Sequence, residues 1–224
     1  MKRKQSGFTL IEIAIVLVII GLLLGGVLKG QELINSAKVK NLAGDFKNVP
    51  VFIYGYQDKF KSLPGDDSSI GGASPHVTGA TACAPAATAN HCNTGNGIID
   101  GNWNATTTAD ESFVFWQQIR LAGLAPGSTD TASGEYIPTN ATGGKIGITN
   151  SGAGLPIATL KGSYIVCSDA IAGKFAKQLD VTLDDGNTAT GSLQVTAAGT
   201  ATGGAAAATA AVVDDTPYLV CMGF

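Results

Sequence analysis

An apolar stretch over residues 8–28 constrains this chain more than any other feature of the sequence. It follows the basic segment Met1–Gly7, and Glu12 is its only ionisable side chain. As an α-helix the stretch would span ~31 Å, which matches the hydrocarbon core of a bilayer. An acidic side chain at the centre of such a helix costs about 2.5–3.5 kcal/mol. Glu12 is therefore a candidate functional residue, and a position near the membrane interface is the alternative.

The junction between Gly7 and Phe8 lies in front of the apolar stretch. An ordinary secretory signal has its small-residue cleavage site behind a shorter apolar segment. Residues 29–32, Lys-Gly-Gln-Glu, contain no such site. Cleavage between Gly7 and Phe8 would keep the apolar segment on the mature protein and give Phe8 a free α-amino group.

The pattern Gly-Phe-Thr-Leu-Ile-Glu at residues 7–12, behind a short basic leader, resembles the prepilin family of type IV pilins and type II secretion pseudopilins. The resemblance implies that prepilin peptidase cleaves after Gly7 and that Phe8 is N-methylated. It also implies that Glu12 pairs with the N-terminal amine of a neighbouring subunit. Many relatives carry a proline where this chain has Lys29.

The resemblance also implies a location and partners. The precursor would cross the inner membrane once, with its head in the periplasm and its apolar segment in the lipid bilayer. An inner-membrane assembly platform would then add it to copies of itself and to sibling subunits, in a filament at the cell surface or in the periplasm.

Four segments follow from the pattern: a leader at 1–7, a transmembrane and assembly helix at 8–28, an amphipathic helix at 29–63 and a globular head at 64–224. Small residues in the helix, namely Gly21, Gly25, Gly26 and Gly30, allow either close helix packing or local unwinding. An apolar stripe continues along the second helical segment at spacings of three and four: Leu42, Phe46, Val49, Ile53, Tyr56 and Phe60. Pro50 is expected to kink this helix, and Leu63-Pro64-Gly65 to end it.

The head is expected to be a small antiparallel β-sheet with two short helices, which gives a pilin-like α+β fold. The predicted strands are 145–149, 159–167, 192–196 and 218–222. A capping box at Thr108 and Glu111 predicts a helix over about 109–122 that buries Phe113, Trp116 and Ile119.

Ser168 or Asp169 is expected to cap a second helix with Ile171, Phe175 and Leu179 on one face. The Ala-, Gly- and Thr-rich residues 197–211 are expected to form an exposed loop. Three head motifs, at residues 63–67, 95–99 and 183–186, look like those of large-headed prepilin-like secretion proteins.

Four cysteines lie in the predicted head: Cys83, Cys92, Cys167 and Cys221. They allow three pairings, of which we favour Cys83–Cys92 as a short loop and Cys167–Cys221 as a link to the C-terminal strand. Disulfides require an oxidising compartment such as the periplasm. Residues 62–224 carry five basic and thirteen acidic residues, so no nucleic-acid partner is expected.

No cofactor and no catalytic role are expected, because the common catalytic motifs are absent and the chain has two histidines. His76 and His91 near Cys83 and Cys92 fit no common zinc spacing. Calcium is a weaker alternative, since some pseudopilins bind it, although no complete calcium loop is present. The candidate ligands are Asp66, Asp67, Asn93, Asn96, Asp100, Asp184 and Asp185.

The sequence therefore predicts a non-enzymatic structural subunit of a type IV pilus or a type II secretion pseudopilus. The alternative is a membrane-anchored periplasmic protein that binds a ligand and does not polymerise.

Overall fold

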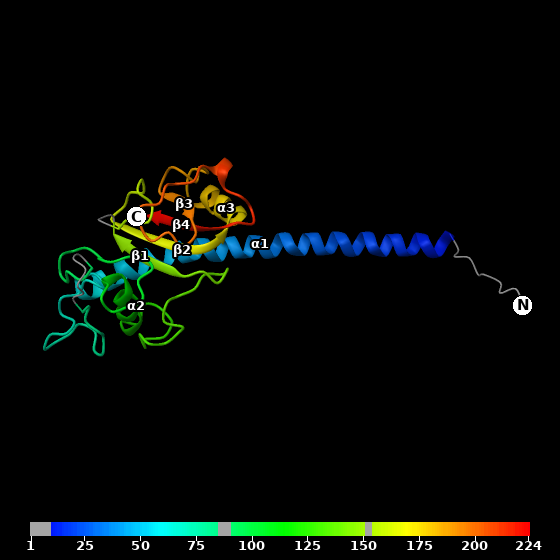
Figure 1. Cartoon of the computed structure of the whole chain (residues 1–224). Coiled ribbons are helices and arrows are strands. Elements are labelled where there is room, and N and C mark those ends of the chain that lie inside the picture. The colour runs from blue at the N-terminus through cyan, green and yellow to red at the C-terminus, as the bar shows by residue number, and fades with distance from the viewer. Residues whose placement is uncertain (1–9, 85–90, 151–153) are drawn as a thin grey trace, which may run out of the picture. The chain divides into compact units, whose positions relative to one another are not determined.

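The computed structural model describes residues 10–84, 91–150 and 154–224 (Figure 1). The chain divides into two compact units, of which the first ends at Lys38 and the second is Val39–Phe224. Helix α1, Leu10–Phe60, contributes to both units and confirms the predicted long N-terminal helix. Gly7 and Phe8 lie outside the described residues.

Between Leu10 and Lys29, α1 is exposed on all sides. Every side chain from Leu10 to Lys29 is exposed, including those on the predicted membrane-spanning stretch. The helix passes without a break through the glycines at 21, 25, 26 and 30, and a Cβ at any of them would meet no other atom within 4 Å. The helix therefore offers its whole circumference to its surroundings.

The part of α1 in the second unit buries one face only. The predicted stripe is confirmed, since Leu42, Phe46, Val49, Ile53 and Tyr56 are buried and Phe60 is half-buried. The helix continues through Pro50 and ends at Phe60, and the amide of Lys61 donates to the carbonyl of Gln57 at 2.8 Å.

A four-stranded antiparallel sheet forms the centre of the head in the described residues. Its strands are β1 (Ile146–Asn150), β2 (Tyr164–Ala172), β3 (Leu193–Ala197) and β4 (Pro217–Gly223), in the order β1-β2-β4-β3. Helix α2 (Glu111–Leu121) contacts β1, and α3 (Gly173–Leu183) contacts β2, β3 and β4. A short 3-10 helix, η1 (Thr209–Ala211), precedes β4. In Figure 1, α3 and α2 lie on opposite sides of the head segment of α1. This is the predicted pilin-like α+β fold.

The two faces of the sheet contribute to two apolar cores. On β2, Val166 packs into the larger core with residues of α1, α2 and α3. Ile165 and Cys167 point to the other face and form a smaller core with Trp103, which the loop over residues 155–160 helps to cover. Alternation along the strand thus buries β2 on both faces.

Two predicted helix starts are wrong. The Thr108–Glu111 capping box does not form: the N-cap of α2 is Asp110, and the Glu111 carboxylate accepts from the amide of Asp100 instead. Ser168 and Asp169 do not cap α3, because β2 extends to Ala172, which is the N-cap. Sheet pairing with β4 continues past a bulge to Ala172, and the strand includes Ile171.

The other element predictions hold with shifted bounds. Strand β2 begins at Tyr164 rather than at residue 159, because residues 155–160 turn across the second core. Phe113, Trp116 and Ile119 of α2 are buried as predicted. The described residues 197–211 are exposed or half-buried and contain no strand beyond Ala197, apart from a single bridge between Ile157 and Gly204.

Candidate functional site

The exposed apolar surface of α1 is the first candidate site. Large apolar side chains between Leu10 and Leu28 expose 46–89% of their surface, and Leu33 and Ile34 continue this surface. Within the described residues, α1 is the helix whose length and composition suffice to cross a membrane, with a mean hydropathy of 2.8 over its most apolar window. Side chains of this kind on all sides of a helix call for lipid or for other helices.

Charged groups mark both ends of this surface. Glu12 lies in the first turn of the described part of α1 and is exposed. At the other end, Lys29 donates to Glu32 at 2.6 Å, one turn along the helix. Glu12 is therefore the one acidic or basic residue between Leu10 and Leu28.

Asp66 and Asp67, two of the predicted calcium candidates, accept hydrogen bonds from protein groups. The carboxylate of Asp66 is buried and accepts backbone amides of Gly95, Asn96 and Gly97. Burial raises the pKa of Asp66, although these amides oppose the shift. Asp66 thus fixes the loop over residues 95–97 against the end of α1.

Asp67 joins the same loop to α1. Its buried carboxylate accepts from the Tyr56 hydroxyl at 2.8 Å and from the Ser69 amide at 2.9 Å, and it lies 2.9 Å from Nδ1 of His76. Burial alone would raise the pKa of Asp67, but these hydrogen bonds outweigh it and lower the pKa. Asp67 and His76 therefore act as local structural links.

Glu111 is a buried carboxyl at the start of α2 that the sequence did not single out as a site. Its Oε2 accepts the amide of Asp100 at 2.9 Å, while its Oε1 has no protein hydrogen-bond partner. Burial raises the pKa of Glu111 to about 8, and the charges of Asp66 and Asp100 add to this shift. The carboxylate of Asp100 itself accepts hydrogen bonds from the side-chain amides of Asn96 and Asn150.

Both favoured disulfides are present. Cys83–Cys92 closes the first loop, and Cys167–Cys221 joins residues directly opposite each other on β2 and β4. One oxygen of Glu111 lies within 4.8 Å of both sulfurs of Cys83–Cys92, but disulfide sulfurs are not thiolate ligands.

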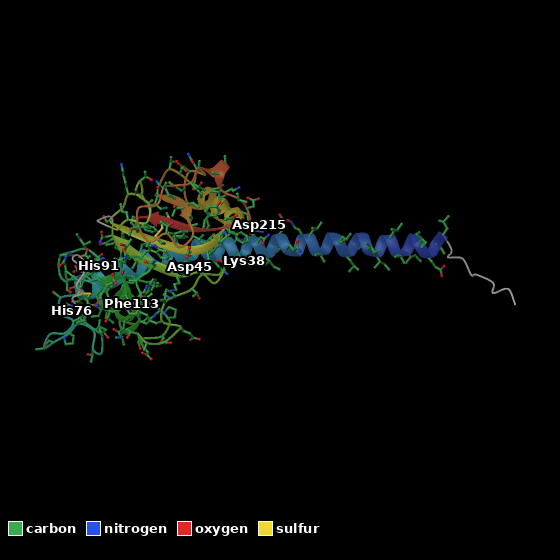
Figure 2. The ribbon with its side chains drawn as sticks, in the orientation of Figure 1. Lys38, Asp45, His76, His91, Phe113 and Asp215 are labelled. Atoms are coloured by element: carbon green, nitrogen blue, oxygen red, sulfur yellow. A yellow bond between two sulfur atoms is a disulfide. The ribbon has the colours of Figure 1, made fainter. Side chains whose placement is uncertain are left out.

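Neither histidine joins a group of three metal-ligating side chains in the part of the chain that the structure describes. Figure 2 shows His76 and His91 at the end of the head formed by the loops between α1 and α2. Nδ1 of His91 lies 2.5 Å from the carboxylate of Asp110. Each histidine therefore contacts a carboxylate and stands apart from any zinc set.

Asp184 and Asp185, two further calcium candidates, form a group with a third acid. One carboxylate oxygen from each of Asp180, Asp184 and Asp185 lies within 4.8 Å of the others. Asp180, near the end of α3, is fully buried, and sequence reasoning missed it. The signal that could have found it is the i, i+4 spacing of Asp180 and Asp184, which places two acids on the same side of a helix end.

Residues 2–28 match a family model described as the prokaryotic N-terminal methylation motif. The motif indicates a precursor of the type IV pilin or pseudopilin type, and the long apolar helix and pilin-like fold agree with that class. A precursor with this motif is a substrate of prepilin peptidase. No curated protein and no solved structure matches the chain.

Proposed function

We propose that this protein is a non-enzymatic structural subunit of a type IV pilus or a type II secretion pseudopilus. It is cleaved after Gly7, N-methylated on Phe8 and polymerised through α1. The observation that supports this most is that the methylation motif leads directly into a helix that is apolar and exposed on all sides.

The exposed helix suits two successive environments. Before assembly, its apolar surface from Leu10 to Leu28 lies in the inner membrane, with the head in the periplasm. The disulfides of the head agree with that oxidising side. During assembly, the same surface packs against the helices of neighbouring subunits, where the open positions at Gly21 and Gly25 allow close approach.

Glu12 sets the register of this packing. Cleavage after Gly7 creates a positively charged amine on Phe8, four residues before Glu12. In apolar surroundings, two unpaired charges cost far more than one close pair. A subunit enters the bundle most favourably where the Glu12 carboxylate of one copy meets the Phe8 amine of another.

The test compares Glu12→Val and Glu12→Gln with a matched control in cells that lack the native protein. The control is Glu32→Gln, which removes an acidic group from the same helix beyond the apolar stretch that ends at Leu28. We expect both Glu12 variants to insert in the membrane and to begin with methylated Phe8, while filament yield falls at least tenfold. Glu32→Gln should assemble normally. Membrane fractionation, mass spectrometry of the N-terminus and filament yield would be measured on the same cultures.

Normal filaments from Glu12→Val would refute the register role. A mature wild-type protein that begins at Met1, or after Leu28, would refute processing at Gly7. A processed wild-type protein that stays monomeric in the membrane beside its assembly genes would favour the anchored ligand-binding alternative.

A further inference from the structure

The carboxyl group of Glu111 lies against the disulfide of the first loop. One of its oxygens lies within 4.8 Å of the sulfurs of both Cys83 and Cys92. The carbonyl of His91 contacts the same groups, since it accepts the Glu111 amide at 3.1 Å and lies 3.8 Å from Sγ of Cys83. Figure 2 labels His91, which marks this place in the head. A disulfide and a fully buried carboxyl group therefore share one site at the start of α2.

Glu111 holds a proton at neutral pH. Burial raises its pKa to about 8, and the charges of Asp66 and Asp100 add to this shift, although the Asp100 amide opposes it. Oε1 of Glu111 is buried and has no protein hydrogen-bond partner. The neighbouring carboxylate of Asp110 lies 2.5 Å from Nδ1 of His91. In the part of the chain that the structure describes, no lysine or arginine forms a salt bridge with Glu111, so its carboxyl group stays neutral.

The two sulfurs of this disulfide differ in access. Cys92 is half-buried, whereas Cys83 exposes only 9% of its surface. A thiolate opens a disulfide by direct attack on one sulfur, so an external thiolate meets Cys92, and Cys83 is the leaving group. A thiolate on Cys83 would be buried close to acidic side chains, where the charged form is costly. Cys83 therefore needs a proton as the bond opens.

The backbone at the start of α2 is not free to stabilise a thiolate. Amides at a helix N-terminus lower the pKa of a neighbouring thiol when they point at it. Here the amides of Glu111 and Ser112 donate to the carbonyls of His91 and Asp100, at 3.1 and 2.9 Å. The neutral carboxyl group of Glu111 remains as the group beside Cys83 that can supply a proton.

We infer that Cys83–Cys92 is a site of thiol–disulfide exchange with a dithiol, and that Glu111 protonates Cys83 as the bond opens. One thiol of the dithiol loses its proton to solvent and attacks Sγ of Cys92. The bond between the two cysteines breaks, its electron pair goes to Cys83, and Cys83 takes the proton of Glu111. This inference does not depend on the proposed filament role.

The second thiol of the dithiol completes the exchange. As a thiolate, it attacks the dithiol's own sulfur in the mixed disulfide and releases Cys92, which takes a proton from water. The dithiol is oxidised to a disulfide, the cysteine pair is reduced, and Glu111 regains its proton from solvent. In the reverse direction, the Glu111 carboxylate takes the proton of Cys83 as the disulfide closes.

The other disulfide of the head lacks these features. Cys167 and Cys221 are fully buried, opposite each other on β2 and β4. Among the described residues, no acidic side chain forms a group with their two sulfurs. A dithiol should therefore open Cys83–Cys92 at least tenfold faster, and Cys167–Cys221 is an internal control in the same molecule.

The test follows reduction by dithiothreitol in the full chain in detergent micelles, starting with both disulfides formed. Samples are quenched with acid, the new thiols are trapped with N-ethylmaleimide, and peptide mass spectrometry gives a rate for each cysteine pair. Each rate is divided by the concentration of dithiothreitol thiolate, which removes the ionisation of the reductant. In the wild type, this rate for Cys83–Cys92 should be constant below the pKa of Glu111, about 8. It should fall at least tenfold by about pH 9.5, where Glu111 has lost its proton.

One variant and one control identify the proton donor. Glu111→Gln keeps an acceptor for the Asp100 amide but has no proton to transfer. Its rate for Cys83–Cys92 should be at least tenfold below the wild type at about pH 6 and independent of pH, so that the two proteins converge at about pH 9.5. His91→Gln removes the nearby imidazole and should keep the wild-type profile. Near-ultraviolet circular dichroism shows whether each variant is folded.

The wild-type profile tests the inference by itself, even if Glu111→Gln does not fold. A wild-type rate per thiolate that is the same at about pH 6 and about pH 9.5 would overturn it. So would a folded Glu111→Gln protein that is reduced as fast as the wild type at about pH 6, or loss of the pH dependence in His91→Gln alone. Equal rates for the two disulfides of the wild type would also contradict it.

Discussion

The two parts of α1 show how one helix serves two different surroundings. Between Leu10 and Leu28, apolar side chains lie on all sides, and all of them are exposed. Between Val39 and Tyr56, buried apolar side chains recur on one face, and exposed lysines such as Lys40 and Lys47 lie off that face. The helical backbone continues through both parts, so the side chains alone make the difference.

The comparison extends to polar groups. In the head, most buried carboxylates are held by backbone amides, as Asp66 is by the amides of residues 95–97. Along the apolar surface from Leu10 to Leu28, Glu12 is the only charged residue. Because polar groups out of water need partners, the fold of the head supplies most of the hydrogen bonds to its buried acids, whereas Glu12 lies on an exposed apolar surface.

The largest expected effect comes from placing the same charge on each part of α1. Leu42 is fully buried, whereas Leu22 is 73% exposed. Leu42→Asp should prevent folding of the head, because an unpaired buried charge costs about as much as the whole stability of a domain, roughly 5–15 kcal/mol. Leu22→Asp should leave the head folded but reduce membrane insertion by about 2.5–3.5 kcal/mol. Near-ultraviolet circular dichroism and membrane fractionation of both variants would measure this.

A native head in Leu42→Asp would show that the α1 stripe is not part of the core. Loss of the head in Leu22→Asp would show that the two parts of the helix depend on each other.

A smaller effect should separate the two disulfides of the head. Cys167 and Cys221 are 54 residues apart and fully buried, whereas Cys83 and Cys92 are nine apart. In the chain-entropy model, the longer loop contributes about 4 kcal/mol and the shorter about 3 kcal/mol to the free energy of unfolding. Urea unfolding of the two double-alanine variants should therefore show the larger loss for Cys167 and Cys221. Membrane insertion should be unchanged in both variants. An equal loss of unfolding free energy in the two variants, or a larger loss for Cys83 and Cys92, would contradict this prediction.

The most gradual effect is the pH dependence of the head. The pKa of Glu111 is about 8 in the folded protein and near 4.5 in an exposed chain. Between these values the folded state holds a proton that the unfolded state has lost. Stability should therefore fall as pH rises from about 4.5 to about 8, by at most ~1.4 kcal/mol per pH unit.

Glu111→Gln should reduce the slope of stability against pH above pH 6. In that range Asp180, with a pKa of about 6, contributes less to the slope because it has largely lost its proton in the folded protein. Urea midpoints at several pH values in EDTA would measure it for both proteins. If the urea midpoint of Glu111→Gln depended on pH as that of the wild type does, the proton would belong to another group.

Patterns that are local in sequence predicted much of this molecule. The continuous apolar stretch after Gly7, the stripe from Leu42 to Tyr56 and the alternating strands each depend on a repeat along one element. Both disulfide pairs also followed from loop length and strand position. Helix starts were less predictable. Glu111 and Ser168 could each hydrogen-bond either within a helix cap or with a residue distant in the sequence, and the spacing of the residues along the chain does not distinguish the two cases.

The sequence by itself determined the long helix, its apolar surface, the processing motif and the α+β class, because helical and strand periodicity and a short linear motif are properties of neighbouring residues. Only the tertiary structure decided which acids are satisfied. It showed that Asp66 and Asp67 accept hydrogen bonds from several donors. It also showed that Asp180 is buried beside Asp184 and Asp185 and that one of its carboxylate oxygens has no hydrogen-bond partner. Burial and hydrogen-bond partners depend on segments that meet across the fold, and a carboxylate's environment is therefore set by residues far from it in the chain.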